Sequence, residues 1–320
     1  MRIAVAGSIA TDHLFTFEGR FSESLLADQL SHVSLSFLAS DLQVRRGGTG
    51  ANIAFGMGVL GARPLLVGAV GKDAADYLAW LQEHAVDTTH VRVSPDQASA
   101  RFTCTTDRDH AQIATFYPGA MSGAAHIDIA DVGEVDLVVI APDDPGAMLR
   151  HSASCRDRGV PFAADPSQQL AFLDGEAIRA LVDGATYLLH NAYEAQLVRD
   201  KTGWSADEVL DRVGTRITTS GADGLLVERT GEEPIRVAAA RASELADPTG
   251  VGDGFRAGFL TATGWGLGLE RSAQVGAVLA TYVLETVGTQ EYTFTPASFS
   301  RRLAQAYGDE AAAEVAPHMP

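Results

Sequence analysis

The stretch ADPTGVGDGFRAGF, Ala246 to Phe259, sets the acid Asp253 among glycines at positions 250, 252 and 254. Glycine has no Cβ, so a glycine-rich backbone approaches other groups closely. A helical pattern follows at Gly254–Gly266, which puts the amides of Gly250 to Asp253 at a helix N-terminus. About half a positive charge accumulates there. The stretch therefore predicts an anion-binding loop with a carboxylate at its mouth.

Two interpretations of Asp253 fit this pattern. A carboxylate repels a phosphate, so beside an anion site it is better suited to take the proton of an acceptor hydroxyl during phosphoryl transfer. The alternative is an ordinary turn or helix cap with no chemical role. The spacing by itself leaves both open.

The rest of the chain alternates between strand and helix patterns, which predicts an α/β fold with a mainly parallel sheet covered on both faces, a three-layer α/β/α arrangement. Apolar runs predict strands at Ile3–Ala6, Leu65–Val70, Leu137–Ala141, Pro161–Asp165, Thr186–His190, Thr215–Thr219 and Leu225–Glu228. Helical spacing predicts helices at Gly48–Leu60, Ala74–His84, Glu176–Leu181, Ala206–Val213, Gly254–Gly266 and Ala273–Glu285, with a capping box at Ser205–Glu208.

Two segments break this alternation, at about 13–46 and 91–118. In the second, ARFTCTTD and AQIATFYPG read as two period-2 strands around a turn at Asp107 to His110. We expect a small antiparallel sheet inserted into one domain of residues 1–320, serving as a lid, a dimer surface or both. The last residues, DEAAAEVAPHMP, are expected to fray.

Composition excludes several classes of protein. The net charge of −17 argues against a nucleic-acid partner, which needs a basic face. The two cysteines, Cys104 and Cys155, are far apart, and the histidines lack zinc spacing, so neither a disulfide framework nor a zinc site is expected. No signal peptide and no run of about 20 apolar residues is present, so we expect a cytoplasmic protein without a membrane partner.

The sequence GMGVLG at Gly56–Gly61 matches the dinucleotide-binding pattern G-x-G-x-x-G literally. That fingerprint must follow a strand and open a helix, whereas this copy lies inside the helical pattern that begins near Gly48. We expect these glycines to allow close helix packing instead of binding a nucleotide.

Four motifs in order resemble those of the ribokinase-like carbohydrate and nucleoside kinases. Asp247–Phe259 resembles the family's second signature, and GGTGANIA at Gly47–Ala54 resembles the first, downstream of a strand that ends in Gly7-Ser8 with Asp12 beyond it. NAYE at Asn191–Glu194 matches the family's N-x-x-E, and TTSGADG at Thr218–Gly224 its nucleotide loop. The resemblance spans nearly the whole chain.

The resemblance implies roles for individual residues. The catalytic base falls on Asp253, and the anion hole on the amides of Gly250, Val251 and Gly252, although the family usually has alanine where Val251 stands. Asn191 and Glu194 would organise Mg²⁺ through water, although both also suit a helix start with a surface acid. The ATP site would be lined by Asn191, Gly252, Thr219, Ser220, Gly221, Ala222, Asp223 and Gly224.

On the acceptor side the resemblance assigns Asp12, Gly48 and Asn52 to the vicinal hydroxyls of a furanose. A carboxylate and an amide suit a cis-diol, although Asp12 is also a plausible turn residue and Asn52 a plausible cap. Phe102 and Phe116 flank the predicted turn, and such rings either sandwich a purine or form lid core.

A narrower resemblance points to adenosine. SLSF at Ser34–Phe37, RFTCTTD, QIATFYPGAM and ADPSQQLA are similar to segments of the actinobacterial adenosine kinases, which would add Ser8, Ser36, Gln168 and Gln169 to the pocket. We therefore expect ATP-dependent phosphorylation of the adenosine 5′-hydroxyl to AMP in purine salvage. Asp165–Gln169 lacks the asparagine and arginine that many sugar kinases carry there.

Two alternative functions and two further expectations accompany this one. A ribokinase or other sugar kinase is the second candidate, and a noncatalytic nucleoside-binding protein the third. K⁺ is a candidate activator, held by carbonyls near Asp247 and the Val287 to Gln290 loop. The apolar lid strands predict a homodimer joined through the lids.

Overall fold

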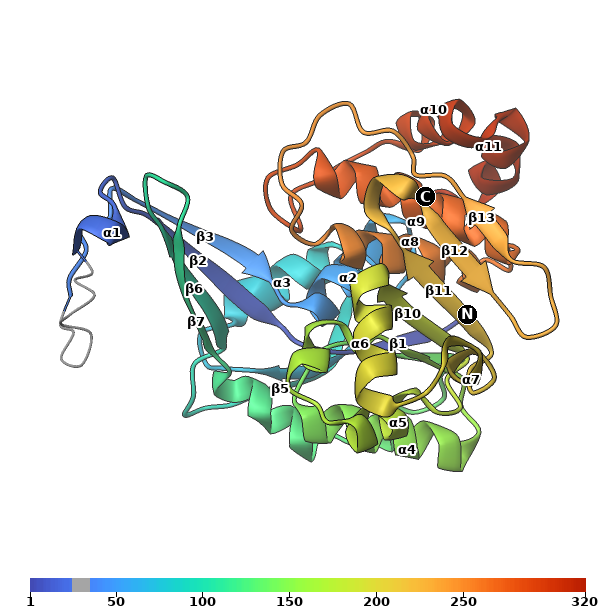
Figure 1. Cartoon of the computed structure of the whole chain (residues 1–320), viewed down its shortest axis with the longest axis horizontal. Helices are drawn as coiled ribbons and strands as arrows, with labels where there is room; N and C mark the ends of the chain where they lie inside the picture. The colour runs from blue at the N-terminus through green and yellow to red at the C-terminus, as the bar shows by residue number, and fades with distance from the viewer. Residues whose placement is uncertain (25–34) are drawn as a thin grey trace.

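The computed structural model describes residues 1–24 and 35–320. Its centre is a nine-stranded sheet in the order β13-β12-β11-β10-β9-β8-β1-β4-β5 (Figure 1). The strands from β5 to β11 pair in parallel, and β12 and β13 add an antiparallel edge. The bounds are β1 Ile3–Ala6, β4 Leu65–Val70, β5 Asp87–Val93, β8 Leu137–Ile140, β9 Phe162–Ala164, β10 Tyr187–Asn191, β11 Thr215–Thr219, β12 Leu225–Glu228 and β13 Ile235–Val237.

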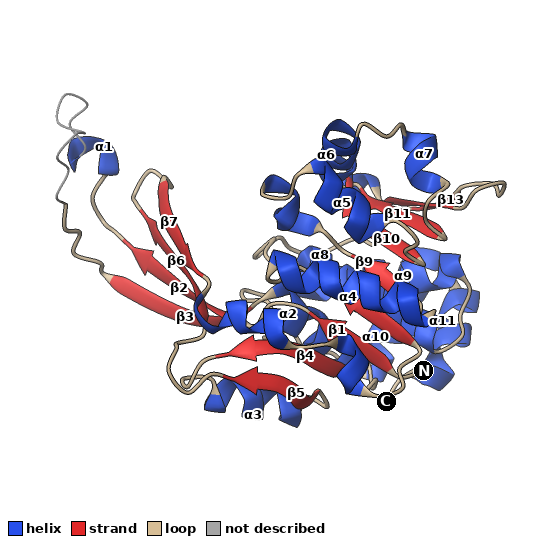
Figure 2. Ribbon diagram, turned by 90° about the horizontal axis from the view of Figure 1, so that it is seen from below, coloured by secondary structure: helices blue, strands red, loops and turns tan. Residues whose placement is uncertain are grey.

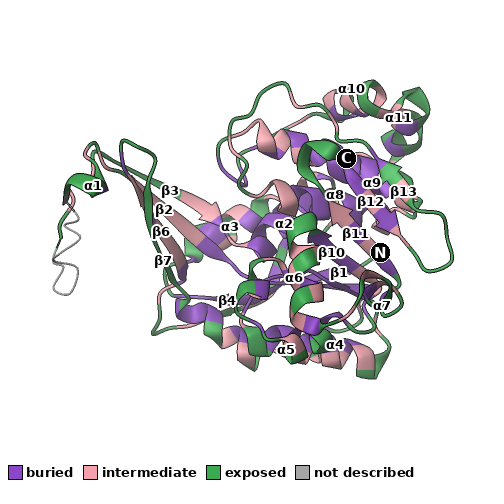
Figure 3. Ribbon diagram, viewed as in Figure 1, coloured by how far each residue is buried: buried purple, intermediate pink, exposed green. Residues whose placement is uncertain are grey.

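Helices cover both faces of this sheet and bury a separate apolar layer against each (Figure 3). One face carries α2 Thr49–Val59, α3 Ala75–Glu83, α8 Val251–Gly264, α9 Leu269–Leu284, α10 Pro296–Tyr307 and α11 Asp309–Val315. The other carries α4 Pro145–Arg158, α5 Gly175–Val182, α6 Ala192–Thr202 and α7 Ala206–Leu210. The predicted three-layer α/β/α fold is confirmed.

The predicted elements of the central sheet all form, because long periodic segments carry the strongest local signal. Four of the predicted strands have the predicted bounds, namely β1, β4, β11 and β12. The capping box at the start of α7 is present, with the Glu208 amide donating to the Ser205 hydroxyl at 3.2 Å. Helix α8 begins at Val251, three residues earlier than predicted, so Asp253 lies within its first turn.

The expectation of a fraying C-terminus is wrong. Residues 309–315 form α11, and Ala311 and Val315, spaced i to i+4, are both fully buried against the core. Apolar side chains at that spacing share one helix face, and their burial holds the end of the chain in place.

A second sheet of four strands, in the order β3-β2-β6-β7, projects from the body (Figures 1 and 2). Its strands are β2 Ala10–Thr16, β3 Asp41–Gly47, β6 Ala100–Thr106 and β7 Gln112–Tyr117, and the short helix α1, Phe21–Ser24, lies at its far end. Strands β2 and β6 pair in parallel, so this sheet is mixed and not antiparallel as expected. We call these four strands the lid sheet.

The glycines of GMGVLG pack helix α2 tightly, as predicted. A Cβ on Gly58 would lie 2.0 Å from the carbonyl oxygen of His84, and one on Gly56 would lie 2.6 Å from the Cβ of Ala257. Helix α2 therefore sits against α8 and the end of α3 at distances that a larger residue would prevent.

Candidate active site

The first glycine motif forms where β1 meets the N-terminus of α2. A Cβ on Gly50 would lie 2.6 Å from the carbonyl carbon of Gly7, so the two backbones touch. Gly48 has a φ of 93°, and a Cβ there would lie 2.6 Å from the Ser8 carbonyl oxygen. The Ser8 hydroxyl accepts a hydrogen bond from the Thr49 amide at 3.0 Å, so Ser8 satisfies one of the free donors of this helix start.

The second glycine motif forms the start of α8. Gly250 is its N-cap residue, with a φ of 76° that favours glycine. A Cβ on Gly252 would lie 2.7 Å from the Nη1 atom of Arg256. The start of α8 thus presents its backbone amides over a short stretch in which Gly250 and Gly252 carry no side chain, as suits an anion site at a helix N-terminus.

The two motifs meet through a hydrogen bond between Asn52 and Asp253. The Asn52 Nδ2 atom donates to the Asp253 Oδ2 atom at 2.8 Å. Burial raises the pKa of Asp253 to about 6, although the Arg256 charge and this hydrogen bond lower it and Glu194 raises it further. A carboxyl with that pKa is ionised at neutral pH and is a competent proton acceptor.

A buried network fixes the orientation of Asn52. Its Oδ1 atom accepts from the Thr289 hydroxyl and the Gln290 Nε2 atom, both at 2.9 Å. Gln290 also donates to the Tyr77 hydroxyl at 2.6 Å, which in turn donates to the Gly47 carbonyl at 2.7 Å. These contacts aim the Asn52 amide donor at Asp253. Tyr77 was not predicted from the sequence because it lies far from both motifs along the chain, and Gln290 was named only as part of the candidate K⁺ loop.

Arg256 forms a buried ion pair below the anion loop. Its Nε atom lies 2.6 Å from the Asp165 Oδ2 atom, and its Nη2 atom donates to Oδ1 at 2.6 Å. Burial raises the pKa of Asp165, and the guanidinium opposes that shift by favouring the carboxylate. Sequence analysis missed Arg256, although a lone arginine among the buried positions of α8 was a usable signal.

The lid sheet aligns the predicted acceptor residues in one row. Asp12 pairs in register with Phe102 on one side and with Arg45 on the other, and Phe102 pairs with Phe116. Residues directly opposite in neighbouring strands project from the same face. This face looks toward the body, because the Arg45 Nη1 atom donates to the Val287 carbonyl at 2.9 Å.

Asp12 is half-buried beside Gly47, where a Cβ would lie 2.8 Å from the Asp12 Oδ2 atom. Burial, and next the charge of Asp247, raise the pKa of Asp12 to about 6. The structure therefore places two carboxyls with raised pKa values, Asp12 and Asp253, on the two sides of the Gly47 to Asn52 segment.

Ser36 is separated from this group. It is exposed, and the adjacent Phe37 packs on Phe17 and Phe21 near the far end of the lid sheet, with ring centroids 4.9 and 5.0 Å apart. Strand β3 begins only at Asp41 and reaches the Asp12 row at Arg45, so within one chain Ser36 does not join the Asp12 row. Ser34 lies outside the described residues.

Gln168 and Gln169 lie in the short 3-10 helix after β9. The Gln169 Nε2 atom donates to the Asp143 carbonyl at 2.9 Å, and Gln168 is exposed with its Oε1 atom accepting from the Ser167 hydroxyl at 2.9 Å. Asp143 follows β8, and the Pro142 carbonyl accepts from the Ser8 amide at 2.9 Å. Gln169 is thus held near the carboxyl ends of β1 and β8, where Ser8 also lies.

The predicted ATP residues meet at the ends of β10 and β11. Asn191 pairs in register with Thr219, so the N-x-x-E motif and the nucleotide loop start side by side. After Thr219 the chain turns through a 3-10 helix, Gly221–Asp223, and Gly224 has a φ of 86°. A Cβ on Gly224 would lie 2.2 Å from the Val237 carbonyl oxygen, so this glycine is required for the turn.

Asn191 and Glu194 form a capping box at the start of α6. The Glu194 amide donates to Asn191 Oδ1, and the Asn191 amide donates to Glu194 Oε2, both at 2.8 Å. Glu194 Oε2 also lies 3.9 Å from Arg256 Nη2. Glu194 therefore caps helix α6, and its carboxylate also faces the loop that carries Asp253.

These residues fit a Mg²⁺ ion held through water. Both contacts of Glu194 use Oε2, which leaves Oε1 outside them. Mg²⁺ binds one or two carboxylates together with waters and substrate phosphates. Over residues 1–24 and 35–320 no cluster of three or more histidine, cysteine, aspartate or glutamate side chains could hold a metal ion without such help. In the same ranges, no helix is both long and apolar enough for a membrane span.

Comparisons with known proteins agree on one family. The model of the pfkB family carbohydrate kinases matches residues 19–296. The nucleoside kinase of Burkholderia thailandensis, in complex with inosine, superposes with a TM-score of 0.85 at 35% identity, covering 96% of this chain and 98% of that one. The nucleoside kinase of Methanocaldococcus jannaschii is 27% identical over 291 residues, 90% of this chain and 92% of its own length. Ribokinase of Arabidopsis thaliana shares the fold, with a TM-score of 0.71 at 17% identity over 98% of each chain.

Proposed function

Because the chain belongs to the pfkB family of carbohydrate kinases, we propose that it is a nucleoside kinase that transfers the ATP γ-phosphoryl group to the 5′-hydroxyl of adenosine. The product would be AMP, which places the enzyme in purine salvage. The observation that carries this proposal is the row Asp12, Phe102 and Phe116 on the face of the lid sheet that looks toward the body. A diol-binding carboxylate beside two aromatic rings suits a ribonucleoside better than a free sugar.

The nucleoside would lie between the lid sheet and the start of α2. Asp12 would accept hydrogen bonds from the ribose hydroxyls, with the Gly48 backbone beside it, and Phe102 and Phe116 would contact the base. An aromatic contact with a base is worth about 1–3 kcal/mol. Gln169 and Ser8 would bind the remaining polar groups of the nucleoside; the Gln169 Nε2 atom donates to the Asp143 carbonyl and the Ser8 amide to the adjacent Pro142 carbonyl, which supports a shared place for them.

Asp253 would accept the 5′-hydroxyl proton as that oxygen attacks the γ-phosphorus in line. Asn52 orients the carboxylate through its 2.8 Å hydrogen bond. The amides of Gly250, Val251 and Gly252 at the start of α8 would stabilise the charge that develops on the transferring group. The nucleotide itself would lie along Thr219 to Gly224. Mg²⁺, held by Glu194 and Asn191 through water, would offset the phosphate charge when bound.

A panel of acceptors tests the proposal. ADP release with ATP and Mg²⁺ would be measured for adenosine, inosine, ribose and fructose at equal concentrations. We expect adenosine to give the highest kcat/KM, with ribose at least about tenfold lower because it lacks the base contact. A preference for ribose or fructose would overturn the adenosine assignment in favour of a sugar kinase. Binding of adenosine without turnover of any acceptor would indicate a noncatalytic protein.

A homodimer joined through the lid sheets is part of this proposal. Leu42, Val44, Ile113 and Tyr117 are each more than two-fifths exposed, and their register places them on the lid face opposite Asp12. Such a face is costly in water. A second copy packed there would also cover the lid ends, where Ser36 lies. Light scattering at micromolar concentration should give the dimer mass, and Val44→Glu should give the monomer mass.

Activation by K⁺, bound by carbonyls near Asp247 and the Val287 to Gln290 loop, is a further part of this proposal. Gly288 donates its amide to the Asp247 Oδ2 atom at 3.2 Å, so the two segments that would supply carbonyls lie together. Replacement of K⁺ by Na⁺ at constant ionic strength should lower kcat if this proposal holds, and unchanged kcat would remove it.

A further inference from the structure

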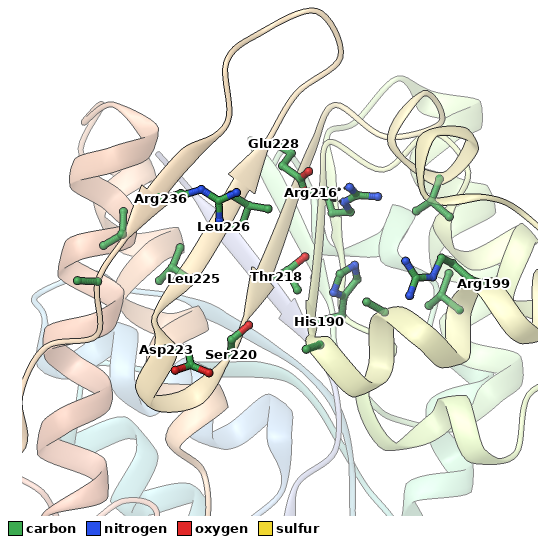
Figure 4. Close-up of a pocket in the computed structure, with 16 residues that line it drawn as sticks. His190, Arg199, Arg216, Thr218, Ser220, Asp223, Leu225, Leu226, Glu228 and Arg236 are labelled. Carbon is green, nitrogen blue, oxygen red and sulfur yellow. Dashed lines mark hydrogen bonds and ion pairs between the residues drawn. The ribbon is translucent and has the colours of Figure 1, made fainter.

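A cavity of about 720 Å³ lies between α6 and the strands from β10 to β13 (Figure 4). Ser220 and Asp223 of the predicted nucleotide loop line it, so we assign this space to the ATP side of the site. On the other side of the body, the lid sheet meets residues 287–291, which we call the bridge segment. Over residues 1–24 and 35–320, the lining of the cavity includes no residue of the bridge segment.

The bridge segment holds the side chain that orients the proposed base. The Thr289 hydroxyl and the Gln290 Nε2 atom each lie 2.9 Å from the Asn52 Oδ1 atom as hydrogen-bond donors. Thr289 is 5% exposed and Gln290 is 1% exposed, so solvent is kept away from these contacts. An amide whose oxygen is fixed presents its nitrogen in one direction. The bridge segment thereby aims the Asn52 Nδ2 atom at Asp253, 2.8 Å away.

The same segment packs against the loop that begins α8. The Gly288 amide donates to the Asp247 Oδ2 atom at 3.2 Å. A Cβ on Gly250, the N-cap residue of α8, would lie 2.8 Å from the Thr289 Cγ2 atom. A displacement of the bridge segment would therefore disturb both the orientation of the base and the loop whose amides would face the transferring phosphoryl group.

Two arginines of the lid strand β3 hold the bridge segment. The Arg45 Nη1 atom donates to the Val287 carbonyl at 2.9 Å, and the Arg46 Nη1 atom lies 3.0 Å from the Glu291 Oε1 atom. The Thr289 hydroxyl also lies 3.0 Å from the Arg46 carbonyl oxygen. Successive residues of a strand project from opposite faces, so the two side chains reach the segment from different sides.

The contact of Arg45 constrains the backbone of the segment more than that of Arg46. A Cβ on Gly288 would lie 2.9 Å from the Arg45 Nη1 atom, so the guanidinium lies directly against this glycine, whose φ is 100°. A charged donor bound to a backbone carbonyl fixes the backbone itself. The Arg46 ion pair joins two side chains that are 35% and 42% exposed, and exposed pairs of this kind contribute little.

We propose that Arg45 is a positioning residue for phosphoryl transfer, acting through the bridge segment and Asn52 on Asp253. The contacts form one chain from the lid sheet to the base. Arg45 is also the register partner of Asp12, with which it shares a face of the lid sheet. The strand pair that would bind the acceptor thus also holds the group that would deprotonate it. The inference rests on the proposed function for the roles of Asp253 and Asp12.

The kcat of Arg45→Met tests the inference, with the acceptor that the panel ranks first, at saturating K⁺ and at pH 8, above the pKa of about 6 of Asp253. Methionine keeps an unbranched stem but cannot donate to the Val287 carbonyl. We expect kcat to fall at least about tenfold, because a misplacement of about 1 Å in a catalytic group can cost about 10²-fold. Arg45→Lys keeps a charged donor and should recover most of the loss.

Arg101→Met is the matched control. Arg101 also joins the lid sheet to the body, through an exposed ion pair with Asp73 at 3.3 Å. Its kcat should stay within about threefold of the wild-type value. A wild-type kcat in Arg45→Met, or an equal loss in both variants, would overturn the inference.

A double-mutant cycle with Asn52→Ala separates positioning from a general structural role. If Arg45 acts through Asn52, then Arg45→Met should change kcat by less than about threefold in the Asn52→Ala background, because residues in one network are not additive. The same loss in both backgrounds would overturn the inference. Calorimetry with ADP should give an affinity for Arg45→Met within about threefold of the wild type, and a tenfold loss would count against positioning, since it would report a general loosening of the site.

Hydrogen–deuterium exchange tests the same contacts without turnover. Peptides that cover residues 247–254 and 286–291 should exchange faster in Arg45→Met than in the wild type or in Arg101→Met. Unchanged exchange in these peptides would refute the role of Arg45. Because this readout needs no acceptor, it distinguishes failure of the inference from failure of the proposed function. A protein that phosphorylates no acceptor would still show the faster exchange.

Discussion

Asn52 and Asp253 lie 201 positions apart in the chain, and the Asn52 amide donates to the Asp253 carboxylate at 2.8 Å. This hydrogen bond joins the two glycine motifs and lowers the pKa of a carboxyl that burial raises to about 6. Loss of the Asn52 donor should therefore raise the pKa of Asp253. Asn52→Ala should move the acidic limb of the kcat profile to higher pH, because the ionised base loses a stabilising contact.

The pH profile of the wild-type enzyme reports both raised carboxyls. Burial raises the pKa values of Asp12 and Asp253 to about 6, and the proposed mechanism requires both in their ionised forms. The value of kcat/KM should therefore fall as the pH drops through about 6, with a limiting slope near two decades per pH unit. Asp12→Asn should reduce that slope to about one. A profile that is flat down to about pH 5 would contradict both roles.

Phe116→Ala tests the base contact separately from the chemistry. Phe116 is 50% exposed on the lid sheet, so its loss should not unfold the protein. We expect KM for adenosine to rise about tenfold, with kcat nearly unchanged, since a base-aromatic contact is worth about 1–3 kcal/mol. Phe172→Ala removes a phenylalanine that is 82% exposed outside the lid, and its steady-state kinetics should match the wild type. Equal effects of the two variants would argue against a base site on the lid.

Arg256→Ala should destabilise the fold. The guanidinium is 6% exposed, and Asp165, its partner at 2.6 Å, is fully buried. Removing one member of a buried pair leaves an uncompensated charge, which typically costs about 3–5 kcal/mol. Urea unfolding should show this loss. The control, Arg229→Ala, removes an exposed ion pair with Glu232, and such pairs contribute at most about 1 kcal/mol.

Gly58→Ala should also destabilise the protein, although alanine has a higher helix propensity than glycine. Alanine gains about 1 kcal/mol over glycine inside a helix. Here its Cβ would meet the His84 carbonyl oxygen at 2.0 Å, and a clash with backbone forces movement that costs about 1–3 kcal/mol. Gly123→Ala is the control, since the nearest atom to its Cβ is 3.4 Å away. If Gly58→Ala unfolded at a higher urea concentration than the wild type, the packing account of GMGVLG would fail.

The central sheet and its main helices could be predicted from sequence, because apolar periodicity and glycine placement are local signals. The start of α8 shows the limit, since the pattern began at Gly254 while the backbone turns helical at Val251. Burial of the C-terminal segment was not predicted, because Ala311 and Val315 form no clear local pattern in the sequence. Their role is visible only where α11 packs against the core. The resemblance assigned Asn52 to the substrate. Its partners Thr289 and Gln290 were named only as part of the candidate K⁺ loop, because no local pattern links them to Asn52. The mixed lid pairing of β2 with β6 likewise depends on strands that are far apart in sequence.

The most direct test of the account is the turnover of Asp253→Asn with adenosine and ATP. Asparagine keeps the shape of the side chain but cannot accept the 5′-hydroxyl proton, so kcat should fall by about 10²–10⁴. Calorimetry should show adenosine affinity within about threefold of the wild type, and urea unfolding should show a folded protein. A kcat within about threefold of the wild-type value would contradict the assignment of Asp253 as the base, and with it the proposed mechanism.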